Sequence, residues 1–302
     1  MPLVPNPAPT GSDNLRGILA MVISMAAFVV ADIIVKYAGT DLPTGELLFF
    51  RGFFALILIT AVAAYAGALK SAWKAVSPLM LLRCLGDIGA NLFFFIAVVR
   101  MPFAEVSAIA QFTPLALTAG AALLFGETVG WRRWLALLVG MLGVLIIIRP
   151  GSSAFDWAAL FVLASVISVS ARDLITRYMG VRFPVLLLAM FTAGAVTVGG
   201  LAMMPFETWV VPSDEMLVLL LISGVCVFIG NYAIIVALQT GEIVVVAPFR
   251  YTILLFAIIG GYIVFGEMPD SITFLGIAVL IGAGLYTLHR ERIRMRTQIR
   301  KG

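Results

Sequence analysis

The sequence predicts an all-α membrane protein with ten transmembrane helices, and three observations lead to that prediction. Of the 302 residues, 62% are hydrophobic and only 12% are charged, and the mean hydropathy is +1.09. Soluble domains have about 45–50% apolar and about 25% charged residues, so the apolar surplus here needs lipid as its solvent. The apolar residues also fall into runs of about 20 residues, which suits membrane-crossing helices and is about twice the length of a barrel strand.

The apolar runs are separated by short segments rich in Pro, Gly and charged residues, which set the expected ends of the helices. We expect spans at 16–38, 46–66, 78–100, 102–124, 133–149, 157–178, 184–204, 215–239, 242–264 and 271–289. Residues 1–15 are rich in Pro and polar residues and are expected to form a disordered tail. Because the connections are short, consecutive spans should be antiparallel neighbours.

The basic residues predict which side of the membrane each loop occupies. With the N-terminus in the cytoplasm, most of the 20 Lys and Arg lie in cytoplasmic loops or in the basic tail 290–302. Cytoplasmic loops of membrane proteins carry such an excess. Both termini are therefore expected in the cytoplasm, with the tail along the anionic lipid surface. The excess of Lys and Arg on the cytoplasmic side accounts for the net charge of +4, so no nucleic-acid partner is expected.

The two halves of the chain match each other at an offset of about 140 residues. The matched positions are Ala31–Gly39 with Arg172–Gly180, Phe125–Glu127 with Phe265–Glu267, and Asn91 with Asn231. A repeat with an odd number of helices must enter the membrane in the opposite sense. We therefore expect two inverted five-helix repeats, 16–149 and 150–289, a design that recurs in transporters with a site between the halves.

These motifs resemble the EamA-type members of the drug/metabolite transporter (DMT) superfamily. The residues that carry the resemblance are Leu123–Glu127, Trp131–Trp134 with the Gly-rich span that follows, and Pro248–Tyr251 leading to Val264–Glu267. The resemblance implies a ten-helix secondary transporter of a small polar metabolite in the bacterial inner membrane. Members of the superfamily move amino acids, nucleosides, flavins and S-adenosylmethionine, so the substrate stays open.

The leading functional hypothesis is amino-acid export by alternating access. The alternatives are import of a larger metabolite such as riboflavin or S-adenosylmethionine and, in another class, a channel-like or structural membrane protein. With one His, two Cys and no enzyme motif, no catalytic residue, cofactor or metal is expected. The expected partners are a small-molecule substrate and membrane lipid, and a monomer is favoured over a dimer.

Ionisable side chains inside the predicted spans are costly and are therefore the first candidates for function. Asp32 and Lys36 lie four residues apart and share a helix face. Asp173 and Arg177 repeat this arrangement in the second half. Each pair either holds helices together or serves as a gate or proton site.

The third span carries a polar stripe formed by Arg83, Asp87 and Asn91, which are spaced four residues apart. Either Arg83 and Asp87 form a structural ion pair, or Asp87 and Asn91 line the substrate cavity. Asn231, followed by Tyr232, is the counterpart of Asn91 in the eighth span. The two amides either bind substrate or form hydrogen bonds between helices.

Arg250 has no acidic residue within a turn or two, although we expect it near the middle of the ninth span. An unpaired guanidinium there should bind a carboxylate or a phosphate. We therefore expect Arg250, with Tyr251 beside it, to contact an anionic group of the substrate. The alternative is a tertiary ion pair with Asp87 or Asp173.

Other charged residues are expected at helix ends. Arg51 lies near the outer face, where it could meet Glu46 or Glu105. Glu127 and Glu267 follow the fourth and ninth spans and are expected to cap loops or act as gating hinges.

Pro and Gly residues predict bends and close contacts. Gln111 with Pro114 interrupts the fourth span, and Pro248 interrupts the ninth at a matching depth. These bends either expose backbone carbonyls to substrate or are purely structural. Small residues permit close helix contact, so we expect intramolecular packing through Gly140, Gly143, Gly276, Gly282 and Gly284.

Overall fold

The computed structural model describes residues 11–67, 69, 76–126, 130–152, 155–179 and 185–299. Within these residues every regular element is helical, and ten helices are long and apolar enough to cross a membrane. The predicted all-α fold with ten spans is therefore confirmed. Glu127, Lys70, Lys74 and Arg182 lie outside the described residues, so the expectations for them stay predictions.

The described residues of the first half form five spans. Their helices are α1 (Gly11–Ala38), α2 (Thr44–Tyr65), α4 (Pro78–Arg100), α5 (Phe103–Ala110), α6 (Thr113–Phe125) and α7 (Trp131–Ile148). α4 begins where expected because the Ser77 hydroxyl accepts the Met80 N–H and Pro78 takes the first helical position. The predicted interruption of the fourth span is present, since Gln111 and Phe112 separate α5 from α6.

The second half repeats this pattern. Its elements are α8 (Ala158–Met179), α9 (Val185–Met203), the 3-10 turn η2 (Met204–Phe206), α10 (Asp214–Thr240), α11 (Ile243–Val246), the 3-10 helix η3 (Ala247–Tyr251), α12 (Thr252–Phe265) and α13 (Ser271–Ile299). Pro248 lies in η3, so the predicted interruption of the ninth span is also present. Proline has no N–H to donate, which favours such a break.

Two helix ends differ from the expected boundaries. α1 begins at Gly11, where an acidic Asp13 in its first turn suits the positive end of the helix dipole. α13 continues to Ile299, into the segment expected as a tail. Residues 290–299 contain no Pro or Gly and consist mainly of good helix formers, so the helix does not need lipid to continue.

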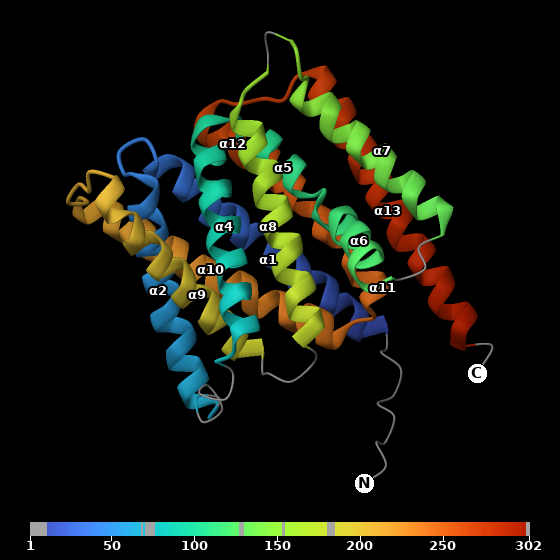
Figure 1. Cartoon of the computed structure of the whole chain (residues 1–302), viewed down its shortest axis with the longest axis horizontal. Helices are drawn as coiled ribbons and strands as arrows, with labels where there is room; N and C mark the ends of the chain where they lie inside the picture. Colours follow the sequence, from blue (N-terminus) through green and yellow to red (C-terminus); the bar gives the residue numbers. More distant parts are fainter. Residues whose placement is uncertain are drawn as a thin grey trace.

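Two helix pairs stand at opposite ends of the bundle: α7 with α13, and α2 with α9 (Figure 1). Between them α1 packs along α10, and α8 packs along α4. α1 begins and α13 ends on the same, lower side in Figure 1. We call this side the terminal face and the other side the opposite face. α10 also ends at the terminal face, where the Asn14 side chain accepts the N–H of Glu242 at 2.8 Å.

The contacts between the halves come in matching pairs. At the offset of about 140 residues, α8 is the counterpart of α1, α10 of α4 and α12 of α6. The contact of α1 with α10 therefore matches that of α8 with α4, and the contact of α1 with α12 matches that of α8 with α6. In the α2–α9 and α7–α13 contacts, each helix packs against its own counterpart in the other half. Two related halves that face each other would give this pattern. The inversion of the second half and the cytoplasmic position of the termini stay predictions.

Glycines allow some helix backbones to approach closely. A Cβ atom added to Gly143 of α7 would lie 3.0 Å from the carbonyl oxygen of Gly276 in α13, so these two glycines pack the halves together as expected. Gly282 instead faces open space. The closest approach between two backbones joins α9 to α2, because a Cβ atom at Gly200 would meet the backbone nitrogen of Phe49.

Gly200→Ala should therefore destabilise the protein, whereas Gly282→Ala should not. The added methyl group at Gly200 must push α9 away from α2, and such overpacking costs about 1–3 kcal/mol. Thermal unfolding of the detergent-purified protein, followed by tryptophan fluorescence, should show a lower Tm for Gly200→Ala only. Equal Tm values for the two variants would contradict the close approach of α2 and α9.

Candidate functional site

A cavity of about 290 Å³ lies inside the bundle and is lined by α2, α4, α8, α9 and α10. α2 and α9 supply small residues, including Gly52, Ala55, Ala189 and Ala193, whose low volume leaves space between the helices. Neither helix was expected at the site, because polar residues in the sequence indicate binding groups but do not show where small side chains leave space. The polar lining residues are Arg51, Arg83, Asn91, Arg172, Asp173, Thr176, Thr192 and Asn231.

The cavity extends from the middle of the bundle toward the terminal face. Its lining includes Arg83 in the second turn of α4, Thr176 in the last turn of α8 and Leu188 in the first turn of α9. The part toward the opposite face is filled by apolar side chains such as Phe95 and Phe103, which are at most 1% exposed. The bundle is therefore hollow toward one face and packed toward the other.

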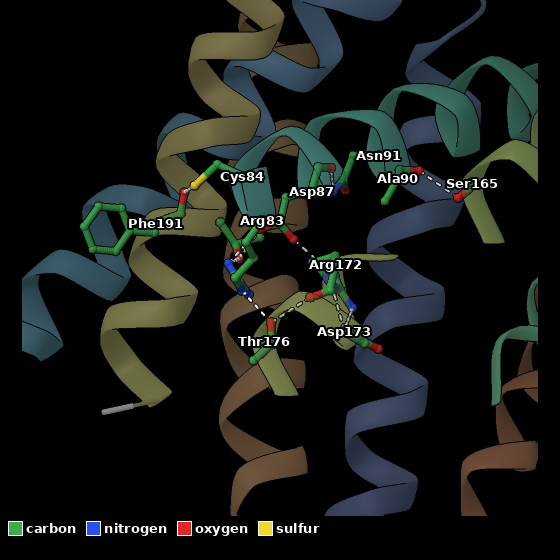
Figure 2. Close-up of polar contacts among 11 residues, drawn as sticks. Arg83, Cys84, Asp87, Ala90, Asn91, Ser165, Arg172, Asp173, Thr176 and Phe191 are labelled. Carbon is green, nitrogen blue, oxygen red and sulfur yellow. Dashed lines mark hydrogen bonds and ion pairs between the residues drawn. The ribbon is translucent and has the colours of Figure 1, made fainter. Parts of the chain in front are cut away.

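Asp87 is fully buried behind the cavity wall and contacts three polar side chains (Figure 2). Its Oδ2 atom accepts hydrogen bonds from Arg83 Nη1 at 2.8 Å and from Thr192 Oγ1 at 2.9 Å. Its Oδ1 atom accepts from Arg172 Nη1 at 3.2 Å. The pair Arg83–Asp87 is thus present, and Arg172 joins it as a second arginine.

The same two arginines extend the network to the cavity surface. Arg83 Nε donates to Thr176 Oγ1 at 2.9 Å, and Arg172 Nη2 lies 2.8 Å from Asp173 Oδ1. A buried ion pair is tolerated only when further hydrogen bonds satisfy both partners, and this network provides them. It fixes α4 against α8 and α9, and so it shapes the cavity wall. We call Arg83, Asp87, Arg172 and Asp173 the Asp87 network.

Asn91 and Asn231 line the same cavity from α4 and α10. Each amide nitrogen donates to a backbone carbonyl four residues earlier, Asp87 at 2.9 Å and Val227 at 2.8 Å. The two amides therefore do not form the hydrogen bonds between helices that we considered. Their oxygens accept no hydrogen bond from any described residue, so they remain available to a ligand.

The expected pair of Asp32 with Lys36 does not form. Asp32 Oδ1 instead lies 2.9 Å from Arg51 Nη1 of α2. Lys36 Nζ donates to Glu267 Oε1 and to the carbonyl oxygen of Met101, both at 2.6 Å. Sequence spacing puts Asp32 and Lys36 on one helix face, but each finds a closer partner on a neighbouring helix.

Arg51 also differs from expectation, because it meets neither Glu46 nor Glu105. Glu46 accepts a hydrogen bond from the Val210 N–H instead. The guanidinium of Arg51 lies over the ring of Phe95, 5.0 Å from its centroid, and lines the cavity. The sequence did not indicate four of the polar lining residues as site candidates, namely Arg51, Arg172, Thr176 and Thr192.

Arg250 lies in η3, at the break that precedes α12, and the depth expected for it stays a prediction. Its side chain is exposed, and no described residue forms an ion pair with it. The alternative of a tertiary ion pair with Asp87 or Asp173 is therefore wrong for the described structure. η3 packs against α1, α11, α12 and α13, and Arg250 does not line the cavity.

Three other candidates lie outside the cavity lining. Tyr251 packs against α13, where a Cβ atom at Gly284 would lie 1.7 Å from its hydroxyl oxygen. Gln111 is buried at the break between α5 and α6. Tyr232 is 56% exposed and stacks on Phe228.

Each half places a cation over a matching aromatic ring. Lys36 Nζ lies 5.0 Å from the centroid of the Phe265 ring, and the guanidinium carbon of Arg177 lies 5.8 Å from that of Phe125. The two phenylalanines are counterparts in the repeat, as are the two cations. Asp173, which the sequence analysis considered together with Arg177, contacts Arg172, its neighbour in the sequence.

Charged contacts connect several helix ends at the opposite face. Glu267 Oε2 accepts the N–H of Phe103 at 2.8 Å, so it caps α5 while holding Lys36 at the end of α1. Arg149 pairs with Asp270 before α13. This guanidinium and the Thr273 N–H hold the pKa of Asp270 below its usual value. The face is therefore closed by polar contacts as well as by apolar packing.

Ten apolar helices around a partly hollow polar interior define a multi-pass membrane protein. The chain belongs to the EamA-like transporter family, whose model matches residues 15–149 and again residues 156–288. It is thus a transporter of the drug/metabolite superfamily, and its bacterial relatives indicate the inner membrane.

The relatives differ in what their names say they move. The S-adenosylmethionine uptake transporter of Rickettsia prowazekii is 28% identical over 93% of this chain and 95% of its own. The riboflavin transporter of Rhizobium johnstonii is 27% identical over 93% of each chain. The pseudopaline exporter of Pseudomonas aeruginosa is 28% identical over 91% and 96%. A solved crystal structure, 18% identical with a TM-score of 0.64, covers 91% of this chain and 98% of its own and shares the fold.

Asp87→Asn should lower stability more than Asp173→Asn. The first change leaves Arg83 and Arg172 without their buried carboxylate, and breaking a buried pair costs about 3–5 kcal/mol. The side chain of Asp173 is 36% exposed, so water can replace its contact. The Tm values of the two purified variants test this, and a Tm for Asp87→Asn at or above that of Asp173→Asn would contradict the structural role of the network.

Proposed function

We propose that this protein is a secondary transporter that moves a small polar metabolite with an anionic group by alternating access. The observation that carries the proposal is Arg250, whose guanidinium forms no ion pair with any described residue. A guanidinium in this setting suits a carboxylate or phosphate, which its planar fork binds through two hydrogen bonds. Arg250 is not among the residues that line the cavity, and its helix η3 packs against α1, α11, α12 and α13.

The carboxylates around the cavity support an anionic rather than a cationic substrate. Asp32 faces Arg51, Asp87 accepts from two arginines, and Asp173 is held by Arg172. Each of these three acids is therefore already compensated by protein. Arg250 has no such compensation from the described residues, and a substrate carboxylate would supply it.

Amino-acid export remains our first proposal for the substrate and direction. Uptake of S-adenosylmethionine is the second, and it is supported by relatives of that name that match nearly the full chain. Both kinds of substrate carry a carboxylate, whereas riboflavin does not, so Arg250 favours them over a flavin. A channel-like pore would not need a cavity that is closed at one face.

The difference between the two faces, one hollow and one packed, supports a carrier in a conformation that is open toward one side. If the termini are cytoplasmic, as the basic residues predict, the cavity lies toward the cytoplasm. Lys36 and Glu267, with the apolar packing beneath them, then close the outer side. Outward opening requires Lys36 to leave Glu267 and the Met101 carbonyl.

Arg250→Ala should raise the KM for transport. Hydrogen bonds to charged groups are worth about 1.5–3 kcal/mol. A tenfold change in a dissociation constant corresponds to about 1.4 kcal/mol. We therefore expect the KM to rise at least roughly tenfold. The measurement is counterflow in proteoliposomes with amino acids, riboflavin and S-adenosylmethionine. Arg132→Gln, at an exposed surface position on α7, is the matched control.

The outcomes of this experiment separate the parts of the proposal. Saturable exchange of a carboxylate-bearing substrate, weakened only in Arg250→Ala, supports it. Unchanged kinetics in Arg250→Ala would remove Arg250 from the substrate site. Absence of exchange for every compound, or unitary currents, would refute the carrier.

Lys36→Gln should shift the protein toward the outward-open state. The reporter is Asn231→Cys in the cavity, in a background in which the free thiols Cys84 and Cys226 are changed to Ala. An impermeant thiol reagent should reach this cysteine mainly from the cytoplasmic side. Lys36→Gln should increase labelling from outside several-fold.

The matched control for this test is Arg100→Gln, which removes an exposed cation at the opposite-face end of α4. It should leave outside labelling as it was. If Lys36→Gln labels no faster from outside than the control, the Lys36–Glu267 contact does not hold the outer side closed.

A further inference from the structure

Arg51 has hydrogen-bonding capacity that the protein does not use. Its side chain is 11% exposed, and its Nη1 atom is buried without a hydrogen bond even though it lies 2.9 Å from Asp32 Oδ1. The guanidinium rests on Phe95. No described residue accepts a hydrogen bond from its other nitrogens, and Arg51 lines the cavity. Those donors are therefore available to a ligand.

Two unused acceptors line the same cavity. The amide nitrogens of Asn91 and Asn231 are held by carbonyls of their own helices. That contact fixes each amide and leaves its oxygen as the free group. The two amides come from α4 and α10, so each half of the chain contributes one.

The other charged groups of the lining contact each other. Arg83 donates to Asp87 and Thr176, and Arg172 contacts Asp87 and Asp173. Satisfied groups of this kind hold the wall together. Arg51, Asn91 and Asn231 line the cavity with donors or acceptors that no described residue satisfies, as does Asp173 through its Oδ2 atom. We call Arg51, Asn91 and Asn231 the inner subsite.

We propose that the inner subsite binds a free α-amino-acid group, with the carboxylate at Arg51 and the ammonium at the amide oxygens of Asn91 and Asn231. A guanidinium binds a carboxylate through paired hydrogen bonds, and an ammonium has only donors, which suit amide oxygens. The inference rests on the proposed transport function and names its substrate class. Amino acids and S-adenosylmethionine share this group, and riboflavin lacks it.

The size of the cavity agrees with this class. Pockets for small ligands occupy about 300–1,000 Å³, and the cavity of about 290 Å³ lies at the small end of that range. A small amino acid fits within it, whereas a larger substrate would place only its amino-acid end there. An amino acid or S-adenosylmethionine has a single carboxylate, so in this proposal that group binds at Arg51 and not at Arg250. Loss of the carboxylate preference in Arg250→Ala, and not in variants of Arg51, would assign it to Arg250 instead.

The test compares probes that differ in one group. Methionine is compared with methioninamide, which lacks the carboxylate, and with N-acetylmethionine, which lacks the ammonium. S-adenosylmethionine is compared with its decarboxylated form. Binding to the purified full chain is measured by calorimetry, and exchange is measured in proteoliposomes. The wild type should bind at least one complete amino-acid group tenfold or more tightly than its truncated partners.

Two sets of variants assign this preference to residues. Arg51→Lys keeps a charge opposite Asp32 but lacks the planar fork, and it should lose the carboxylate preference. Asp32→Asn with Arg51→Gln removes both partners, so no charge is left buried alone, and it should lose the preference too. Asn91→Leu with Asn231→Leu should bind N-acetylmethionine about as well as methionine, while Arg132→Gln should behave as the wild type.

Each outcome bears on a different claim. Exchange of riboflavin alone, or of truncated and complete probes alike, would overturn the substrate class while the transporter stands. Full carboxylate preference in both folded Arg51 variants would overturn the role of Arg51. Exchange of no compound would instead count against the proposed transport function.

Discussion

The structure depends on how one buried carboxylate is compensated inside a membrane. Asp87 has no exposed surface, and an ionised group at that depth is tolerated only with charged and hydrogen-bonding partners. Arg83 comes from the same helix, whereas Arg172 and Thr192 come from α8 and α9. Because these partners lie on three helices, satisfying Asp87 also fixes the helices around the cavity. The bond from Ser165 to the carbonyl of Ala90 ties α8 to α4 further along.

The two faces of the bundle use different interactions, and this asymmetry is what a carrier needs. Toward the opposite face, Glu267 joins Lys36 to the start of α5 above a buried apolar core. Toward the terminal face, small residues on α2 and α9 leave a hollow. The cation over Phe265 has a counterpart over Phe125, so related contacts occur in both halves. In the proposed cycle, the contacts at one face loosen as those at the other face tighten.

The sequence was sufficient for features that depend on local pattern. Hydropathy located the ten spans, Pro248 and the Gln111 region marked the broken helices, and spacing identified Arg83 with Asp87. Spacing failed where a distant partner was better placed, as for Lys36 and Glu267, which are 231 residues apart. Polar residues alone also could not locate the cavity, because the space is created by small side chains on α2 and α9.

Satisfied and unsatisfied polar groups separate structural residues from candidate binding residues in this bundle. The Asp87 network bonds within itself and to Thr176 and Thr192. Arg51, Asn91, Asn231 and Arg250 keep donors or acceptors that no described residue uses. Two of these four residues belong to each half of the chain. A ligand shifts a conformational equilibrium only by binding one state better than the other. Because the proposed ligand contacts come from both halves, any movement of one half against the other changes them together, which gives substrate binding a direct means of biasing the transport cycle.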